Sequence, residues 1–264
     1  MIRMEPTQMA DFFGDTRESF LWSCKQGIMG SFYAKEAEHI RAALAVLGDF
    51  TFFDGEPDRE LVTFLPKESN PDFRILVPPD KAWGRLIEES YFGHLRKITR
   101  YRMKKKTENF DTELLKQASK LPERYVFQDI DRTFYKSCKE EEWSRDFTAQ
   151  FSDYEKFRQY GRGVLVLKNG RPVSGAASYS AWQGGIEIEV DTKKEYRRKG
   201  LAFACSARLI LECLKEGLCP SWDAHTEVSL ALAKKLGYEL EAPYIAYEIY
   251  GEEVKETVVS HKGK

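Results

Sequence analysis

The chain has 264 residues with 41 basic and 42 acidic side chains, so it is close to charge balance at pH 7. Hydrophobic residues make up 42% and charged residues 31% of it, a composition that excludes a mainly disordered protein. No apolar run reaches the roughly 18 residues of a membrane span, and the first residues lack the apolar stretch of a signal peptide. We therefore expect a soluble globular protein that stays in the cytoplasm and has no membrane partner.

The first 121 residues predict a mixed α/β region. In chain order we expect an extended segment over 27–34, a helix over 35–47, an extended segment over 49–53, a strand over 73–77, a helix over 80–91 and a strand over 94–103. This region has no Gly-rich phosphate loop and no cluster of metal ligands, so its function cannot be read directly. The change of pattern at Lys120–Arg124 predicts two domains, 1–121 and 122–264.

The last of these strands is strongly basic. Seven of the eleven residues from Arg96 to Lys106 are Lys or Arg. Such a strand either resists pairing at a sheet edge or binds an anion such as RNA. Because the whole chain is near charge balance, we favour the first reading and expect no nucleic-acid partner.

The five cysteines do not indicate a disulfide framework. Their number is odd and none forms a C-x-x-C pair, so we expect reduced thiols and no metal site. They are Cys24, Cys138, Cys205, Cys213 and Cys219.

The second half carries sharper signals. A helix capped by Ser152 and ended by Gly161 precedes a strand over 164–167, and Asn169-Gly170 predicts a tight hairpin. Two further strands, 173–180 and 186–192, complete three antiparallel strands in sequence. We then expect a helix over 199–216, a strand over 219–222, a helix over 226–236, and two final strands over 238–240 and 244–250.

The stretch Tyr196-Arg-Arg-Lys-Gly-Leu-Ala202 lies between a strand and a long helix. The first N–H groups of a helix have no intrahelical acceptor and carry partial positive charge, so this terminus favours a phosphate group. Arg197, Arg198 and Lys199 add positive charge, while Gly200 and Ala202 remove bulk where a ligand would approach the backbone. The stretch therefore predicts a pyrophosphate site.

The spacing Arg197-x-x-Gly200-x-Ala202 resembles the acyl-CoA motif of the GCN5-related N-acetyltransferases (GNAT). The order of the elements over about 125–250 is similar to the core of that superfamily. Glu187-Ile-Glu189, Trp222-Asp-Ala224 and the run from Ser229 to Tyr238 resemble, within it, the GNAT acetyltransferase family that includes zwittermicin A resistance proteins. This resemblance extends over most of the chain.

The resemblance implies an α/β fold of the GNAT type, with a mixed, mostly antiparallel sheet flanked by helices and a smaller α/β region before it. The N-terminal region would build the acceptor pocket or be a degenerate GNAT-like unit. The resemblance also implies acetyl-CoA as the cosubstrate and no metal. The implied coenzyme-binding residues are Val190, Asp191, Thr192, Arg197, Arg198, Lys199, Gly200, Leu201, Ala202, Thr226 and Ser229.

Glu187 and Glu189 are the candidates for the catalytic base. The period of a strand places both on one face just before the coenzyme loop, and the sequence does not separate them. The tyrosine that many superfamily members use as a general acid falls on Ala233. His225, Tyr238, Tyr244 and Tyr247 remain as alternative proton donors, of which His225 is taken as the third catalytic candidate.

The sequence thus predicts an N-acetyltransferase that moves an acetyl group from acetyl-CoA to the amine of a small molecule by direct attack. Two alternatives stay open: a degenerate coenzyme-binding sensor, and an RNA- or anion-binding module that uses the basic strand. A homodimer is left open as well.

Overall fold

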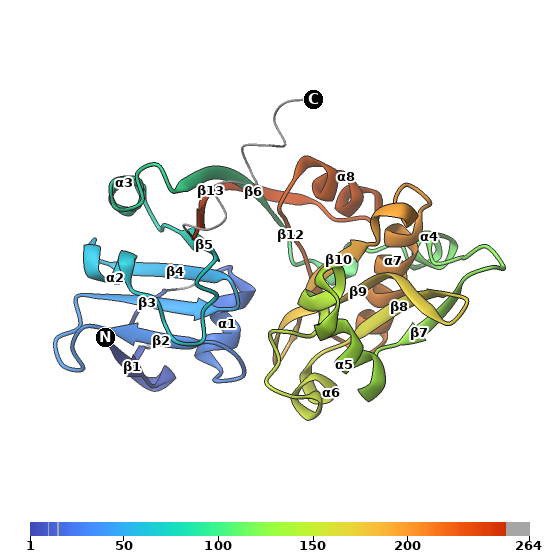
Figure 1. Ribbon diagram of the computed structural model, residues 1–264, viewed down its shortest axis with the longest axis horizontal. Helices are drawn as coiled ribbons and strands as arrows, with labels where there is room; N and C mark the ends of the chain where they lie inside the picture. Colours follow the sequence, from blue (N-terminus) through green and yellow to red (C-terminus); the bar gives the residue numbers. More distant parts are fainter. Residues whose placement is uncertain (10, 15, 252–264) are drawn as a thin grey trace. The chain divides into compact units, whose positions relative to one another are not determined.

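The computed structural model describes residues 1–9, 11–14 and 16–251 (Figure 1). The chain divides into two units, which are Met1–Arg100 with the chain from Tyr244 onward, and Tyr101–Pro243. Among the residues described, every helix is too short or too polar to span a bilayer.

Unit 1 is built on a mostly antiparallel sheet with strand order β1-β2-β3-β4-β5-β13-β6. Strands β4 and β5 pair in parallel, with Phe50 opposite Ile75. The strands are β1 (Ile2–Met4), β2 (Ser31–Ala34), β3 (Ala42–Leu47), β4 (Phe50–Gly55), β5 (Phe73–Val77), β6 (Leu95–Met103) and β13 (Leu240–Tyr250). The helices are η1 (Pro6–Met9), α1 (Ser19–Lys25), α2 (Arg59–Thr63) and α3 (Lys81–Ser90).

The core of unit 1 explains why the helix expected over 35–47 was wrong. Ala42–Leu47 is strand β3, and all six of its residues are buried between β2 and β4. A strand buried on both faces lacks the alternation of apolar and polar residues. Its continuous apolar run therefore cannot be distinguished from a buried helix by periodicity. Trp83 on α3 is fully buried in this core and donates from Nε1 to the Gly55 carbonyl at 3.0 Å.

Unit 2 contains a second sheet, of order β11-β10-β9-β8-β7. The three antiparallel strands expected from the sequence are confirmed as β8, β9 and β10, and α7 packs along the sheet. The strands of this sheet are β7 (Val126–Asp129), β8 (Gly163–Lys168), β9 (Arg171–Trp182), β10 (Gly185–Thr192) and β11 (Cys219–Ser221). Strand β12 (Asp223–Ala224) is not part of it and pairs with Tyr101 and Arg102 at the end of β6. The helices are η2 (Thr107–Asn109), α4 (Thr112–Ala118), α5 (Arg132–Glu140), η3 (Glu142–Phe147), α6 (Tyr154–Tyr160), η4 (Lys194–Tyr196), α7 (Leu201–Lys215) and α8 (Glu227–Lys235).

The local details of unit 2 confirm one turn and correct two expectations. Asn169 and Gly170 both have positive φ, as the predicted hairpin requires. Asp153, rather than Ser152, caps α6, because its carboxylate accepts from the Lys156 N–H at 2.9 Å. The two strands expected at the end of the chain are the single strand β13.

The boundary between the units differs from the one expected near Leu121. The segment that carries α4 belongs to unit 2, since α4 packs on α7. Part of the expected domain 122–264 lies outside the described residues, which end at 251. The division into domains 1–121 and 122–264 stays a prediction from the sequence.

The two units repeat one topological pattern without a repeat in sequence. In unit 1, antiparallel β3 and β4 are followed by a helix and by β5, which is parallel to β4. In unit 2, antiparallel β9 and β10 are followed by a helix and by β11, which is parallel to β10. The connecting helix has five residues in unit 1 and fifteen in unit 2.

The basic strand β6 uses several of its cations inside the fold. Arg100 is buried and lies over the ring of Phe50 at 4.8 Å. The ion pairs are Arg96 with Glu248 at 2.5 Å, Lys97 with Glu88 at 2.9 Å and Lys104 with Glu239 at 2.7 Å. Cations already paired with carboxylates are poorly placed to neutralise phosphates, which argues for the structural reading of this strand.

Candidate functional site

The sheet of unit 2 opens along β10. This strand pairs in parallel with β11 over three residue pairs, the last of which is Glu187 opposite Ser221. It then continues to Thr192 with β9 on its other side. The edge of β10 beyond Glu187 thus offers peptide N–H and C=O groups to an extended ligand that itself carries amide groups.

The loop after β10 ends at Gly200, the residue before α7. Gly200 has a φ of 77° and Arg198 a φ of 61°, both in the left-handed region. A Cβ atom on Gly200 would meet no other atom within 4 Å, so the backbone is open on this side. The N-terminus of a fifteen-residue helix with no acidic residue in its first turn is well suited to an anionic group.

A cavity of about 830 Å³ connects the end of β10, this loop, α7 and α8. Eleven of the residues proposed for the coenzyme or for catalysis line it. They are Val190, Asp191, Thr192, Arg197, Arg198, Gly200, Leu201, Ala202, His225, Thr226 and Ser229. The sequence therefore located most of the wall of this cavity.

Three proposed residues do not line the cavity. Lys199 is turned away, with Nζ donating to the Glu195 carbonyl at 2.7 Å and lying over the ring of Tyr196. Glu187 and Glu189 lie further back along β10. Of the three basic residues proposed for the coenzyme, only Arg197 and Arg198 border the cavity.

These two arginines have different surroundings. Arg197 donates from Nε to the Thr192 carbonyl at 2.9 Å and contacts an Asp191 carboxylate oxygen at 3.3 Å, so it ties the loop to the end of β10. Arg198 is exposed and has no side-chain partner in the described part of the chain. Arg198 is thus the loop cation best placed to contact an anionic ligand.

Sequence reasoning missed one wall of the cavity. The other lining residues are Tyr196, Phe203, Val228, Ala231, Leu232 and Lys235. Four of these lie on α8 at helical spacing, and the Val228 side chain is 81% exposed. An apolar stripe left uncovered on a short helix beside the coenzyme motif was the signal that could have revealed this wall.

Glu187 and Glu189, which the sequence could not separate, differ in burial. Glu187 is only 3% exposed, whereas Glu189 is half-buried. Ser180 on β9 and Ser221 on β11 are the direct cross-strand partners of Glu187, and both are buried. Their hydroxyl oxygens have no hydrogen-bond partner in the described chain. Directly opposite residues share a face of a sheet, so these hydroxyls flank the Glu187 side chain where the sheet opens.

Thr226 and Ser229 hold the start of α8. The Thr226 hydroxyl accepts from the Ser229 N–H at 3.2 Å, which makes Thr226 the N-cap of the helix. The Ser229 hydroxyl accepts from Nε1 of the buried Trp222 at 3.1 Å. Both side chains therefore position α8 as a wall of the cavity, whatever they contribute to a ligand.

We expect Thr226→Ala to lower the free energy of unfolding by about 1 kcal/mol, because the Ser229 N–H loses its acceptor. Thr226→Ser keeps the hydroxyl and should stay close to the unmodified protein. Urea denaturation of the three proteins measures the effect. Equal stability of the alanine and serine variants would show that the cap is unimportant.

The tyrosines considered as proton donors do not line the cavity. Tyr238 is buried and donates to the Pro220 carbonyl at 2.6 Å, and burial raises its pKa well above the usual range. Tyr247 donates to Glu88 in unit 1. Ala233 is itself fully buried. Of the donors named from the sequence, His225 alone borders the cavity.

Burial makes the cysteines poor nucleophiles. It raises the pKa of Cys205 to about 12 and the pKa of Cys219 to about 11, so the thiolate fraction near neutral pH is very small. The other three, Cys24, Cys138 and Cys213, have pKa values of about 12 for the same reason. No group of three or more His, Cys, Asp or Glu side chains that could hold a metal ion occurs among the residues described.

We expect native protein at pH 8 to resist iodoacetamide, because a thiol with a pKa of 11 or 12 is ionised at a level of roughly one in a thousand or less. Unfolding in urea should expose all five thiols to rapid modification. Intact-mass spectrometry follows the reaction. Rapid addition of one group to the native protein would reveal an activated cysteine and contradict this expectation.

The chain is similar to known acetyltransferases in sequence and in fold. The model of the GNAT acetyltransferase family matches residues 10–247. A GCN5-related N-acetyltransferase-like protein from Streptococcus suis is 46% identical, with a TM-score of 0.87 over 93% of this chain and 98% of that one. A GCN5-related N-acetyltransferase from Kribbella flavida shares the fold, with 16% identity and a TM-score of 0.53 over 82% of this chain and 89% of that one.

A curated relative, the uncharacterized N-acetyltransferase YdfB of Bacillus subtilis, is 29% identical over 153 residues. That match covers 55% of this chain and 56% of the relative, so the chain spans about half the length of the curated relative. The mixed α/β fold expected from the sequence is confirmed. Given the family match over most of its length, the chain belongs to the GNAT acetyltransferase family.

Proposed function

We propose that the protein is an N-acetyltransferase that transfers an acetyl group from acetyl-CoA to an amine of a small molecule. One observation carries the proposal. The cavity of unit 2 joins the N-terminus of α7 to the part of β10 beyond its last pair with β11, and the buried Glu187 stands in that last pair. A phosphate site, an edge for amide groups and a carboxylate thus follow one another along a single strand and loop.

The residues present fit acetyl-CoA. Arg198 and the first N–H groups of α7 would hold the pyrophosphate, with Gly200 leaving the backbone accessible. The edge of β10 over Val190–Thr192 would hydrogen-bond the amide groups of the pantetheine arm. The apolar stripe of α8, with Val228 and Leu232, would cover the arm from the other side.

Acetyl-CoA, when bound, supplies the acetyl group as a thioester, which a neutral amine can attack with loss of the thiolate. Glu187 would accept the proton that the amine gives up, directly or through one water molecule. The hydroxyls of Ser180 and Ser221 flank Glu187 and would orient its carboxylate or that water. His225 borders the cavity and is the candidate that would return a proton to the leaving thiolate.

Release of free thiol from acetyl-CoA tests the proposal, with a panel of diamines, amino sugars and amino acid amides as acceptors. We expect at least one amine to accelerate thiol release and to gain the mass of an acetyl group. The resemblance to resistance proteins makes an amine-bearing natural product or metabolite the acceptor class to try first.

One observation favours a second candidate, an acetyl-CoA-binding sensor without turnover. Ala233 stands where many superfamily members place a tyrosine, and it is buried. The sensor would bind acetyl-CoA, yet no amine would accelerate thiol release. The same assay, run beside a binding measurement, therefore separates the two candidates.

A further inference from the structure

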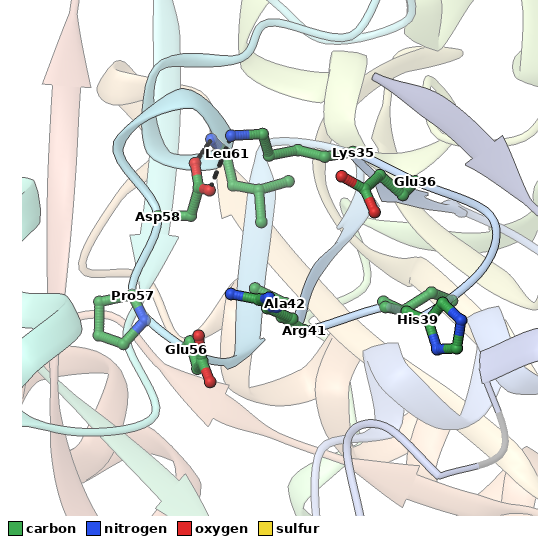
Figure 2. Close-up of a pocket in the computed structure, with 10 residues that line it drawn as sticks. Lys35, Glu36, His39, Arg41, Ala42, Glu56, Pro57, Asp58 and Leu61 are labelled. Carbon is green, nitrogen blue, oxygen red and sulfur yellow. Dashed lines mark hydrogen bonds and ion pairs between the residues drawn. The ribbon is translucent and has the colours of Figure 1, made fainter.

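Unit 1 contains a cavity of its own, of about 540 Å³ (Figure 2). The segment between β2 and β3 forms one side of it, and the turn between β4 and α2 forms the other. Its lining includes Lys35, Glu36, Arg41, Glu56, Asp58 and Leu61. None of them lines the cavity of unit 2.

The position of this cavity follows from the repeated topology. The turn after β4 in unit 1 corresponds to the loop after β10 in unit 2, because each leads from the last antiparallel strand through a helix to a parallel strand. The chain therefore has a cavity beside the same connection in both units. Only the one in unit 2 has the chemistry of a phosphate site.

The charges of the turn in unit 1 disfavour the binding of phosphate. It carries Glu56 and Asp58 at a place where unit 2 carries arginines. The Asp58 carboxylate accepts from the N–H groups of Glu60 and Leu61, at 2.8 and 3.2 Å, so the start of α2 is occupied by the chain's own anion. The nearby cation, Lys35, pairs with Asp58 and Glu60 at 3.1 and 2.9 Å. A pyrophosphate would meet carboxylates here.

Three charged groups on the wall remain available. Glu36, Arg41 and Glu56 are exposed and have no side-chain partner within the part of the chain described. Figure 2 draws the two carboxylates on opposite sides of the cavity, with the Arg41 side chain extending between them. Buried Ala42 and Leu61 lie at the base of the cavity, and the more exposed Ile40 and Pro57 add accessible apolar surface to this floor. Two anions and one cation over an apolar floor fit a ligand with two ammonium groups, one carboxylate and a short hydrocarbon body.

We propose that the cavity of unit 1 binds a basic amino acid. Arg41 holds the carboxylate of the ligand, and Glu36 and Glu56 hold its two ammonium groups. This assignment rests on unit 1 alone and stands whether or not unit 2 transfers acetyl groups.

Calorimetric titration of the full chain with L-lysine tests the site, with two probes that each lack one group. Cadaverine lacks the carboxylate and norleucine lacks the second ammonium group. We expect lysine to bind one per chain, and each of the other two to bind about tenfold or more weakly, since each loses one charge-assisted contact.

Variants assign the binding to these residues. Glu56→Gln should weaken lysine binding about tenfold or more, and Arg41→Gln should weaken lysine while leaving cadaverine unchanged. Glu38→Gln is the matched control, because Glu38 is an exposed carboxylate in the same loop that does not line the cavity. All three positions are exposed, and thermal unfolding verifies that each variant is folded.

Several results would overturn the proposal. The first is no detectable binding at a lysine concentration of about 10 mM, which exceeds the dissociation constants of specific sites. The second is equal affinity for lysine and cadaverine. The third is an equal loss of lysine affinity in Glu38→Gln and Glu56→Gln. All of these binding measurements can be interpreted even if unit 2 does not transfer acetyl groups. The two proposals can therefore be contradicted independently.

Discussion

Replacing Glu187 by glutamine is expected to lower kcat by about 10² to 10⁴-fold, the usual range for loss of a general base. Glutamine has nearly the same size and suits a buried site, so the fold should persist. The affinity for acetyl-CoA should change less than about twofold, because Glu187 does not line the coenzyme cavity. Steady-state thiol release and calorimetric titration measure the two quantities.

Glu189→Gln is the matched control, since it makes the same change two residues along the same strand. It should retain most of kcat because Glu189 is half-buried and lies beyond the last pair of β10 with β11. A larger loss in Glu189→Gln than in Glu187→Gln would give the role of base to Glu189. Equal and small losses would remove both residues from the mechanism.

Gly200→Glu should weaken acetyl-CoA binding by roughly 100-fold, since it sets a negative charge against the proposed pyrophosphate site and costs charge-assisted hydrogen bonds. A Cβ at this position meets no atom within 4 Å, so the variant has room to fold. Calorimetric titration with acetyl-CoA measures the loss.

Gly217→Glu controls for backbone strain and for net charge. Gly217 has a φ of 72° and also leaves its Cβ open, but it lies at the other end of α7, roughly 20 Å along the helix axis. It should bind acetyl-CoA as well as the unmodified protein does. Equal weakening in both variants would mean that helix stability, and not the pyrophosphate site, explains the effect.

The parts of the fold that follow from local signals were predicted well. The hairpin at Asn169-Gly170 and the end of α7 at Gly217 depend on residues that tolerate positive φ, and such residues are visible in the sequence. Strand β3 was missed because what makes it a strand is its burial between β2 and β4, which a local pattern does not record.

The sequence indicated some parts of the candidate site and not others. The loop and the start of α7 could be found because a contiguous motif builds them. The separate environments of Glu187 and Glu189 could not be found, because they depend on where β11 stops pairing with β10. The directions of the Lys199 and Tyr238 side chains likewise depend on contacts with Glu195 and Pro220, which the spacing of residues in the sequence does not predict.

We expect acetyl-CoA to bind at the N-terminus of α7 in unit 2, and not in the cavity of unit 1. Calorimetric titration of the full chain with acetyl-CoA measures this binding. We expect saturable binding of one molecule per chain, weakened by high salt because the pyrophosphate contacts are electrostatic. Two molecules per chain would contradict the exclusion of phosphate from unit 1, and no binding at all would contradict the coenzyme site itself.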